Sequence, residues 1–120
     1  MRKVCVLDDH LSVLKATSRL LLSAGLEAET FSNPNEFLRY AESEKPSVIV
    51  MDMQMPVMNG IEVQKRLRSV SPGTRVIVFS SDDDPAIRCQ AIDAGASAFF
   101  LKPVHDEELL AAIHAALDND

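Results

Sequence analysis

The stretch that decides the fold is SVIVMDMQMPVMNG, residues 47–60. Residues 48–51 form a short, uninterrupted apolar run rich in β-branched side chains, which is typical of a strand buried on both faces of a parallel sheet. Pro56 and the Asn59–Gly60 pair predict a loop after this strand. Asp52 therefore ends a central strand, at the edge where open α/β sheets bind their ligands. It is a candidate nucleophile or metal ligand, and the structural alternative is a helix cap or a solvated turn residue.

The composition limits the classes of protein to which the chain can belong. The chain has 120 residues, 47% of them hydrophobic and 25% charged, so we expect one domain over residues 1–120. The formal net charge of -6 argues against direct nucleic-acid binding by this domain. No apolar run reaches the roughly 20 residues of a membrane span, and no signal peptide precedes the first strand pattern. Cys5 and Cys89 lack a CxxC neighbour, so we expect reduced thiols in a cytoplasmic protein.

Five apolar strand patterns alternate with helical patterns along the chain. The predicted strands are residues 3–7, 27–31, 48–51, 75–79 and 98–101. The predicted helices follow the acidic pair at 8–9 and begin at 33, after 60, at 85, and at 105 or 106. This alternation predicts an α/β fold, namely a flavodoxin-like, doubly wound five-stranded parallel sheet of strand order 2-1-3-4-5 with five helices. The leucines expected on or near one face of the first helix, at helical spacing, are Leu11, Leu14, Leu21 and Leu22.

Several polar side chains follow the predicted strands directly and should converge at one edge of the sheet. They are Asp8, Asp9, Asp52, Ser80 and Lys102. Close carboxylates repel one another by about 1 kcal/mol per pair at about 4 Å in water, and by about 4 kcal/mol at an effective dielectric near 20. Lys102 offsets part of this repulsion, and Mg²⁺, which takes few carboxylates and keeps several waters, would offset more. The set fits phosphoryl transfer through an aspartyl phosphate, whereas the structural alternative is a row of helix caps.

Four motifs carry a resemblance to a known family. They are VLDD at 6–9, MDMQMPVMNG at 51–60, VFSS at 78–81 and GASAFFLKP at 95–103. Together and in this order, they resemble the receiver domain of a bacterial two-component response regulator over essentially the whole chain. The FLKP ending at 100–103 and the DDDP helix start at 82–85 are most similar to receivers of LuxR/FixJ-type transcriptional regulators.

The resemblance implies a phosphoacceptor switch that catalyses only its own phosphorylation and dephosphorylation, rather than an enzyme with a turnover substrate. Asp52 would accept a phosphoryl group from a sensor histidine kinase. Asp9, Asp52 and the backbone carbonyl of Gln54 would bind Mg²⁺, with Asp8 acting mainly through water.

The resemblance also assigns the output side of the site. Ser80 would hydrogen-bond the phosphoryl group, and Lys102 would pair with it. Phe99 would be the switch aromatic, and its ring would leave the surface when Ser80 moves; threonine and tyrosine are commoner at these two positions. The Lys102–Pro103 peptide is expected to be cis. Switching would change partner binding or homodimerisation, and a DNA-binding output domain would lie outside this chain.

Gln54 and Asp82 each lie two residues beyond a site residue, so both should flank the phosphoryl group and affect its lifetime.

Three other classes of protein are alternatives to a receiver domain. An aspartate-nucleophile phosphatase needs a second acid where Gln54 stands, a flavodoxin-like cofactor binder needs a hydroxyl-rich first loop, and a scaffold that is never phosphorylated would not need the complete acidic set. His10, next to the acidic pair, is expected to be solvated or kinase-facing, because Mg²⁺ prefers oxygen ligands.

Overall fold

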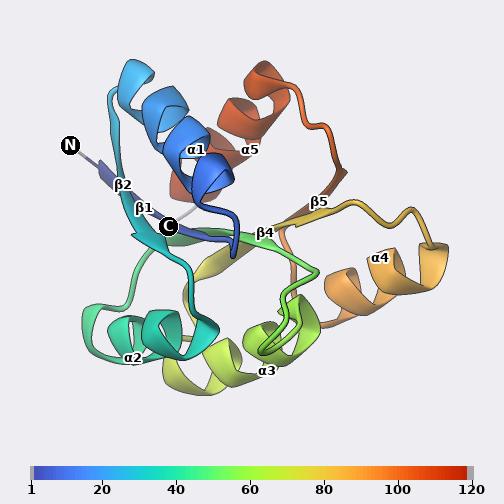
Figure 1. Ribbon diagram of the computed structural model, residues 1–120. Helices are drawn as coiled ribbons and strands as arrows, with labels where there is room; N and C mark the ends of the chain where they lie inside the picture. The colour runs from blue at the N-terminus through green and yellow to red at the C-terminus, as the bar shows by residue number, and fades with distance from the viewer. Residues whose placement is uncertain (1, 119–120) are drawn as a thin grey trace.

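The computed structural model describes residues 2–118, which form a parallel sheet between two layers of helices (Figure 1). The strands are β1 (Arg2–Leu7), β2 (Leu26–Phe31), β3 (Val48–Asp52), β4 (Arg75–Ser80) and β5 (Ala98–Leu101). The helices are α1 (Leu11–Ser23), α2 (Pro34–Glu44), α3 (Gly60–Val70), α4 (Pro85–Asp93) and α5 (Asp106–Asp118). The sheet has the order β2-β1-β3-β4-β5, which confirms the predicted topology. Within residues 2–118, every helix falls short of the length and apolar content that a membrane span needs.

The two faces of the sheet are covered by different helices. α1 and α5 lie on one face, and α2, α3 and α4 lie on the other (Figure 1). Alternate strand residues point to opposite faces, so Cys5 and Leu7 pack on the α2–α4 side, whereas Val4 and Val6 pack on the α1–α5 side. β3 is buried along its whole length, as its uninterrupted apolar run predicts. Asp52 is thus carried by the most deeply enclosed strand.

Local signals in the sequence set the ends of the helices. Asn33, Asn59 and Asp84 cap α2, α3 and α4, because their side-chain oxygens accept backbone N–H groups of the first turn. Gly25 and Gly95 follow α1 and α4 with φ of 77° and 103°, a conformation that glycine adopts without strain. These signals explain why most element boundaries agree with the sequence prediction to within one or two residues.

The leucines of α1 differ from the prediction. Leu14 and Leu21 are buried, but Leu11 and Leu22 are 65% and 62% exposed. The buried face of α1 is the line of Leu14, Thr17 and Leu21. At about 3.6 residues per turn, Leu11 and Leu22 lie roughly a quarter turn around the helix from that line. Of the four leucines expected on or near one face, only Leu14 and Leu21 therefore belong to the buried face.

Candidate functional site

The site is built where the strands end. Asp8 follows β1 and Lys102 follows β5, whereas Asp52 and Ser80 are the last residues of β3 and β4. Because β3 lies between β1 and β4, Asp52 has the acidic pair on one side and Ser80 on the other. Asp8, Asp52 and Ser80 are only 2%, 3% and 0% exposed. The structure therefore brings these side chains to one buried edge of the sheet.

Lys102 faces two of the carboxylates. Its Nζ lies 3.5 Å from Asp52 Oδ2 and 3.7 Å from Asp8 Oδ2. Asp9 adds a third carboxylate to the same group. One ammonium group cannot neutralise three carboxylates, so the pocket keeps negative charge that attracts a cation.

The peptide bond from Lys102 to Pro103 is cis, as expected from the sequence.

The surroundings of Asp52 change its acidity. Burial raises the pKa of this carboxyl group, and the charge of Lys102 opposes that rise. Asp8 raises the pKa further, whereas the hydrogen bond that Gln54 N donates to Asp52 Oδ1, at 3.3 Å, lowers it. The folded protein therefore leaves the negative charge of Asp52 incompletely stabilised. Added positive charge at this position would favour the ionised, nucleophilic form.

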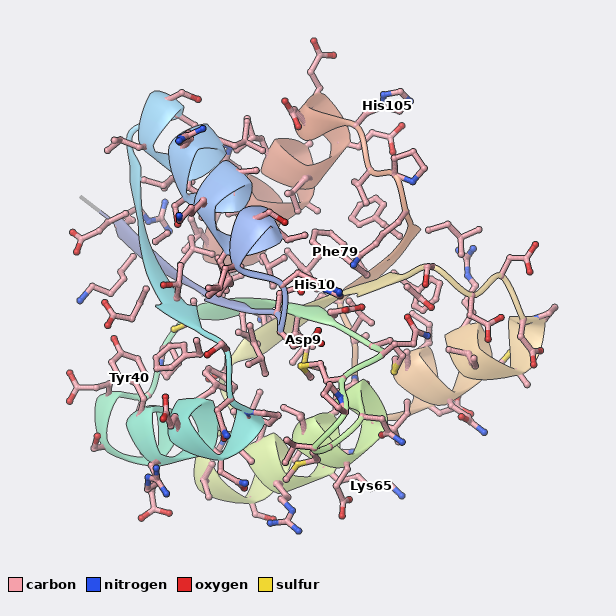
Figure 2. The ribbon with its side chains drawn as sticks, in the orientation of Figure 1. Asp9, His10, Tyr40, Lys65, Phe79 and His105 are labelled. Carbon is pink, nitrogen blue, oxygen red and sulfur yellow. The ribbon has the colours of Figure 1, made fainter. Side chains whose placement is uncertain are left out.

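The acidic pocket fits a divalent metal ion. Ligand atoms of Asp8, Asp9, His10 and Asp52 all lie within 4.8 Å of one another. Within residues 2–118, Asp8 Oδ2 and Asp9 Oδ1 are buried and have no hydrogen-bond partner. Carboxylate oxygens are the ligands that hard cations prefer, so these two oxygens suit Mg²⁺. Figure 2 shows Asp9 and His10 together at this edge of the sheet.

The side chain of Gln54 bridges two loops, a contact that the sequence analysis missed. Gln54 Nε2 donates to Ser80 Oγ at 2.8 Å, and Gln54 Oε1 accepts from Ser81 N at 3.3 Å. Ser80 Oγ also accepts from Asp82 N at 3.0 Å and donates to Asp82 O at 3.2 Å. We call Gln54, Ser80, Ser81 and the Asp82 backbone the Gln54 clasp. Its signal in the sequence is weak, namely a long amide two residues after Asp52.

The carboxylate of Asp82 is turned toward the start of α4. Asp82 Oδ1 accepts a hydrogen bond from Asp84 N at 3.0 Å, and the residue is exposed. Aspartate commonly forms such a local turn before a helix. The influence of Asp82 on a phosphoryl group therefore stays a prediction.

The ring of Phe99 lies inward. It is 9% exposed and packs in the cluster on the α2–α4 side of the sheet. Arg88 of α4 places its guanidinium carbon 5.9 Å from the ring centroid, which is cation–π distance. The expected switch begins with this ring on the surface, whereas here the ring is already covered by α4. The reason is that core packing and the Arg88 contact both favour the inward position.

Comparison with known proteins identifies the family. The family model described as the response regulator receiver domain matches residues 4–114. The chain therefore belongs to the response regulator receiver domain family. Response regulator protein TodT of Pseudomonas putida F1 is 40% identical to it over 114 residues, which cover 95% of this chain and 50% of TodT. The chain thus spans about half the length of this relative.

Solved structures agree with the fold. A CheY-like response regulator receiver domain protein from Methanospirillum hungatei JF-1 matches with a TM-score of 0.92 at 27% identity, covering 99% of this chain and 95% of that one. The beryllofluoride-activated NtrC4 receiver domain dimer matches with a TM-score of 0.93 at 28% identity, covering 99% and 98%. These matches confirm the flavodoxin-like, CheY-like architecture predicted from the sequence.

Proposed function

We propose that this chain is the phosphoacceptor of a two-component system, in which a sensor histidine kinase transfers a phosphoryl group to Asp52. The observation that carries the proposal is the position of Asp52. This carboxylate is buried at the end of the central strand, and its Oδ2 lies 3.5 Å from Lys102 Nζ. An acidic pair lies on one side of it and a hydroxyl group on the other. A phosphoryl group on Asp52 would therefore meet the ammonium group of Lys102 and the hydroxyl donor of Ser80 together.

The transfer forms one bond and breaks one. A carboxylate oxygen of Asp52 attacks the phosphorus of phosphohistidine, the O–P bond forms as the N–P bond breaks, and the histidine nitrogen takes a proton from solvent. Lys102 would neutralise charge on the phosphoryl oxygens. Asp9, Asp52 and the Gln54 carbonyl would hold Mg²⁺, with Asp8 acting through water, and the metal would add further positive charge. The same residues would serve hydrolysis of the aspartyl phosphate, so in this proposal the domain catalyses its own phosphorylation and dephosphorylation.

Ser80 and Phe99 support a switch. A phosphoryl group on Asp52 would offer Ser80 a charged acceptor, which is stronger than a neutral one. To reach it, the Ser80 hydroxyl must give up its bonds in the Gln54 clasp. Because the ring of Phe99 is already inward, the switch would not require a ring to move in from the surface. Phosphorylation would instead rearrange the loop before α4 and the contact between Arg88 and Phe99. Phosphorylation would shift a two-state equilibrium by its differential affinity for the two states.

In this proposal, the downstream response is produced by a domain outside this chain or by a binding partner. We assign residues 1–120 to one receiver domain, and the half-length match to TodT leaves room for a second domain. The FLKP and DDDP motifs favour a LuxR/FixJ-type DNA-binding domain there. The NtrC4 receiver is described as a dimer in its beryllofluoride-activated form, which supports homodimerisation on phosphorylation. Cys5 and Cys89 are both free, which supports a cytoplasmic location.

Incubation with Mg²⁺ and acetyl phosphate, followed by intact-mass measurement, tests the proposal. We expect one added phosphoryl group in the wild type and none in Asp52→Asn or in the presence of EDTA. Asp93→Asn, which changes an exposed aspartate at the end of α4, is the matched control and should be phosphorylated normally. Undiminished phosphorylation of Asp52→Asn would refute the assignment.

A further inference from the structure

The imidazole of His10 is directed at the acidic pair. Its Nδ1 lies 3.1 Å from Asp8 Oδ1 and 3.3 Å from Asp9 Oδ1. His10 is the N-cap residue of α1, yet its side chain makes no capping hydrogen bond. Its backbone N–H donates to Asp8 Oδ1 at 2.9 Å, which fixes the turn between the carboxylate and the ring. The side chain is 63% exposed, so one edge of the ring meets solvent while the other faces the pocket.

These separations match those between ligands of one metal ion. Adjacent ligands at right angles, with bonds of about 2.1 Å, lie roughly 3.0 Å apart. Nδ1 of His10 has this spacing to both carboxylates, and the whole group, including Asp52, lies within 4.8 Å. Small rotations of side chains would complete the set. His10 is therefore as well placed as the carboxylates to reach a shared cation.

A second observation points to a ligand at this place. Asp8 is 2% exposed, and its Oδ2, although 3.7 Å from Lys102 Nζ, has no hydrogen-bond partner within residues 2–118. Asp9 Oδ1 is likewise buried without a hydrogen bond in the same part of the chain. Buried carboxylate oxygens are normally hydrogen-bonded or bound to metal. The pocket is therefore incomplete beside the imidazole.

We propose that His10 is a direct nitrogen ligand, and that it makes the preference of the pocket for first-row transition cations over Mg²⁺ stronger than that of a pocket with oxygen ligands alone. The proposal rests on the proposed function only in using the same acidic pocket. Neutral imidazole binds nickel, copper, iron and zinc well, whereas carboxylate and water suit magnesium. A contribution from Nδ1 therefore favours the former group of cations. His10 is 63% exposed, in agreement with the expectation of a solvated residue, but its Nδ1 also faces the acidic pair.

A competing role for His10 is to donate a hydrogen bond that orients Asp8. That role predicts equal weakening of every cation when the ring is removed, because only the carboxylate is affected. Direct ligation predicts a selective loss for cations that favour nitrogen. The two roles therefore separate in the ratio of affinities rather than in either affinity alone.

Isothermal titration with Ni²⁺ and, separately, with Mg²⁺ measures this ratio. All proteins carry Cys89→Ser, because Cys89 is an exposed thiol that would bind nickel. We expect His10→Ala to lower the Ni²⁺ affinity about tenfold or more and the Mg²⁺ affinity less than about threefold. Excess Mg²⁺ should displace Ni²⁺ from this site in the wild type. His105→Ala, which removes an exposed imidazole away from the pocket (Figure 2), should leave both affinities unchanged.

A spectroscopic measurement tests the same contact without a variant. In protein with ¹⁵N-labelled histidine, Zn²⁺ should shift the Nδ1 resonance of His10, and Mg²⁺ should move it far less. Equal loss of Ni²⁺ and Mg²⁺ affinity in His10→Ala, or no loss of either, would overturn the assignment of His10 as a ligand. If neither cation binds the wild-type pocket, the proposed magnesium site fails as well. Magnesium binding with an unchanged affinity ratio would overturn only the role of His10.

Discussion

The two sides of Asp52 differ in how complete they are. On the β1 side, Asp8 and Asp9 have buried oxygens that lack hydrogen-bond partners within residues 2–118, and Lys102 faces more than one carboxylate. On the β4 side, the Ser80 hydroxyl is hydrogen-bonded to two neutral partners, the side-chain amide of Gln54 and the backbone of Asp82. The first side lacks positive charge, whereas the second is already satisfied. A ligand completes the acidic side, but it must displace an existing contact on the hydroxyl side.

This difference suggests that the acidic side serves phosphoryl transfer and metal binding, whereas the hydroxyl side controls the conformational switch. Buried carboxylates without enough positive charge cost stability, which is the usual condition of a site that binds a cation or a reacting group. A satisfied hydroxyl stabilises one arrangement of the loop before α4 and holds it until a stronger acceptor appears. We therefore expect substitutions on the acidic side to change reaction rates and metal binding. Substitutions in the Gln54 clasp should instead change the balance between two conformations.

After loss of the phosphoacceptor Asp52 itself, the largest effect should come from Lys102→Ala. This change removes the ammonium group that faces Asp52 and Asp8, so the phosphoryl oxygens lose their protein cation. We expect phosphorylation by acetyl phosphate to slow about 100-fold, the size typical of losing one electrostatic contact to a transition state. Stopped aliquots analysed by intact mass give the rate. Lys65→Ala on the exposed face of α3 is the control, and equal rates for the two variants would show that Lys102 has no part in the transfer.

A smaller effect should appear in the stability of Asp52→Asn without metal. Burial raises the pKa of Asp52 in the folded protein, so the folded state holds its proton to higher pH than the unfolded chain does. Wild-type stability then falls as the pH rises from the unfolded pKa of about 3.9 through the folded one. The neutral asparagine avoids this loss, so Asp52→Asn should be more stable by on the order of 1 kcal/mol at pH 7.

Urea unfolding of both proteins across pH measures this gain. The advantage of Asp52→Asn should shrink as the pH falls toward the unfolded pKa, and Mg²⁺ should reduce it at pH 7 by stabilising the wild type. A variant less stable than the wild type at pH 7 without metal would show that Lys102 compensates the buried charge fully.

Gln54→Ala tests the hydroxyl side. Phosphorylation should still occur at Asp52, because the backbone of residue 54 is retained. Loss of the neutral bond from Gln54 to Ser80, worth about 1 kcal/mol, should make the switch about fivefold easier. A beryllofluoride titration in Mg²⁺, followed by the amide resonances of Ser80 and Ser81, gives the midpoint. Gln90→Ala on α4 is the control, and an unmoved midpoint in Gln54→Ala would remove the clasp from the switch.

The smallest effect is expected from Asp82→Ala. Its carboxylate forms a local turn with Asp84, so the fold should be retained. We expect the dephosphorylation rate to change by roughly threefold through an influence on the attacking water, far below the roughly 100-fold or greater effect of a directly positioned general acid or base. Phosphate release from phosphorylated protein measures this rate, with Asp83→Ala as the control. A rate equal to that of the wild type would limit Asp82 to its turn.

The sequence predicts well those features that depend on local pattern. The apolar run at 48–51 ends at Asp52, and parallel strands bring their carboxyl ends to one edge, so the acidic side follows from strand order alone. The Gln54 clasp and the inward ring of Phe99 could not be predicted from the sequence. The clasp depends on which side chain fills the space between two loops, and the position of the ring depends on which side chain packs under α4. The direction of the His10 ring likewise depends on a turn fixed by its own backbone bond to Asp8.

We expect Asp52, and not its neighbouring carboxylates, to carry the phosphoryl group. Three acids share this pocket, so a mass increase alone does not distinguish among them. Reduction of the phosphorylated protein with borohydride converts the aspartyl phosphate to homoserine, and tandem mass spectrometry of the peptides then locates it. We expect homoserine at position 52 and unmodified aspartate at positions 8 and 9. Homoserine at either of those positions, with position 52 unchanged, would contradict this assignment.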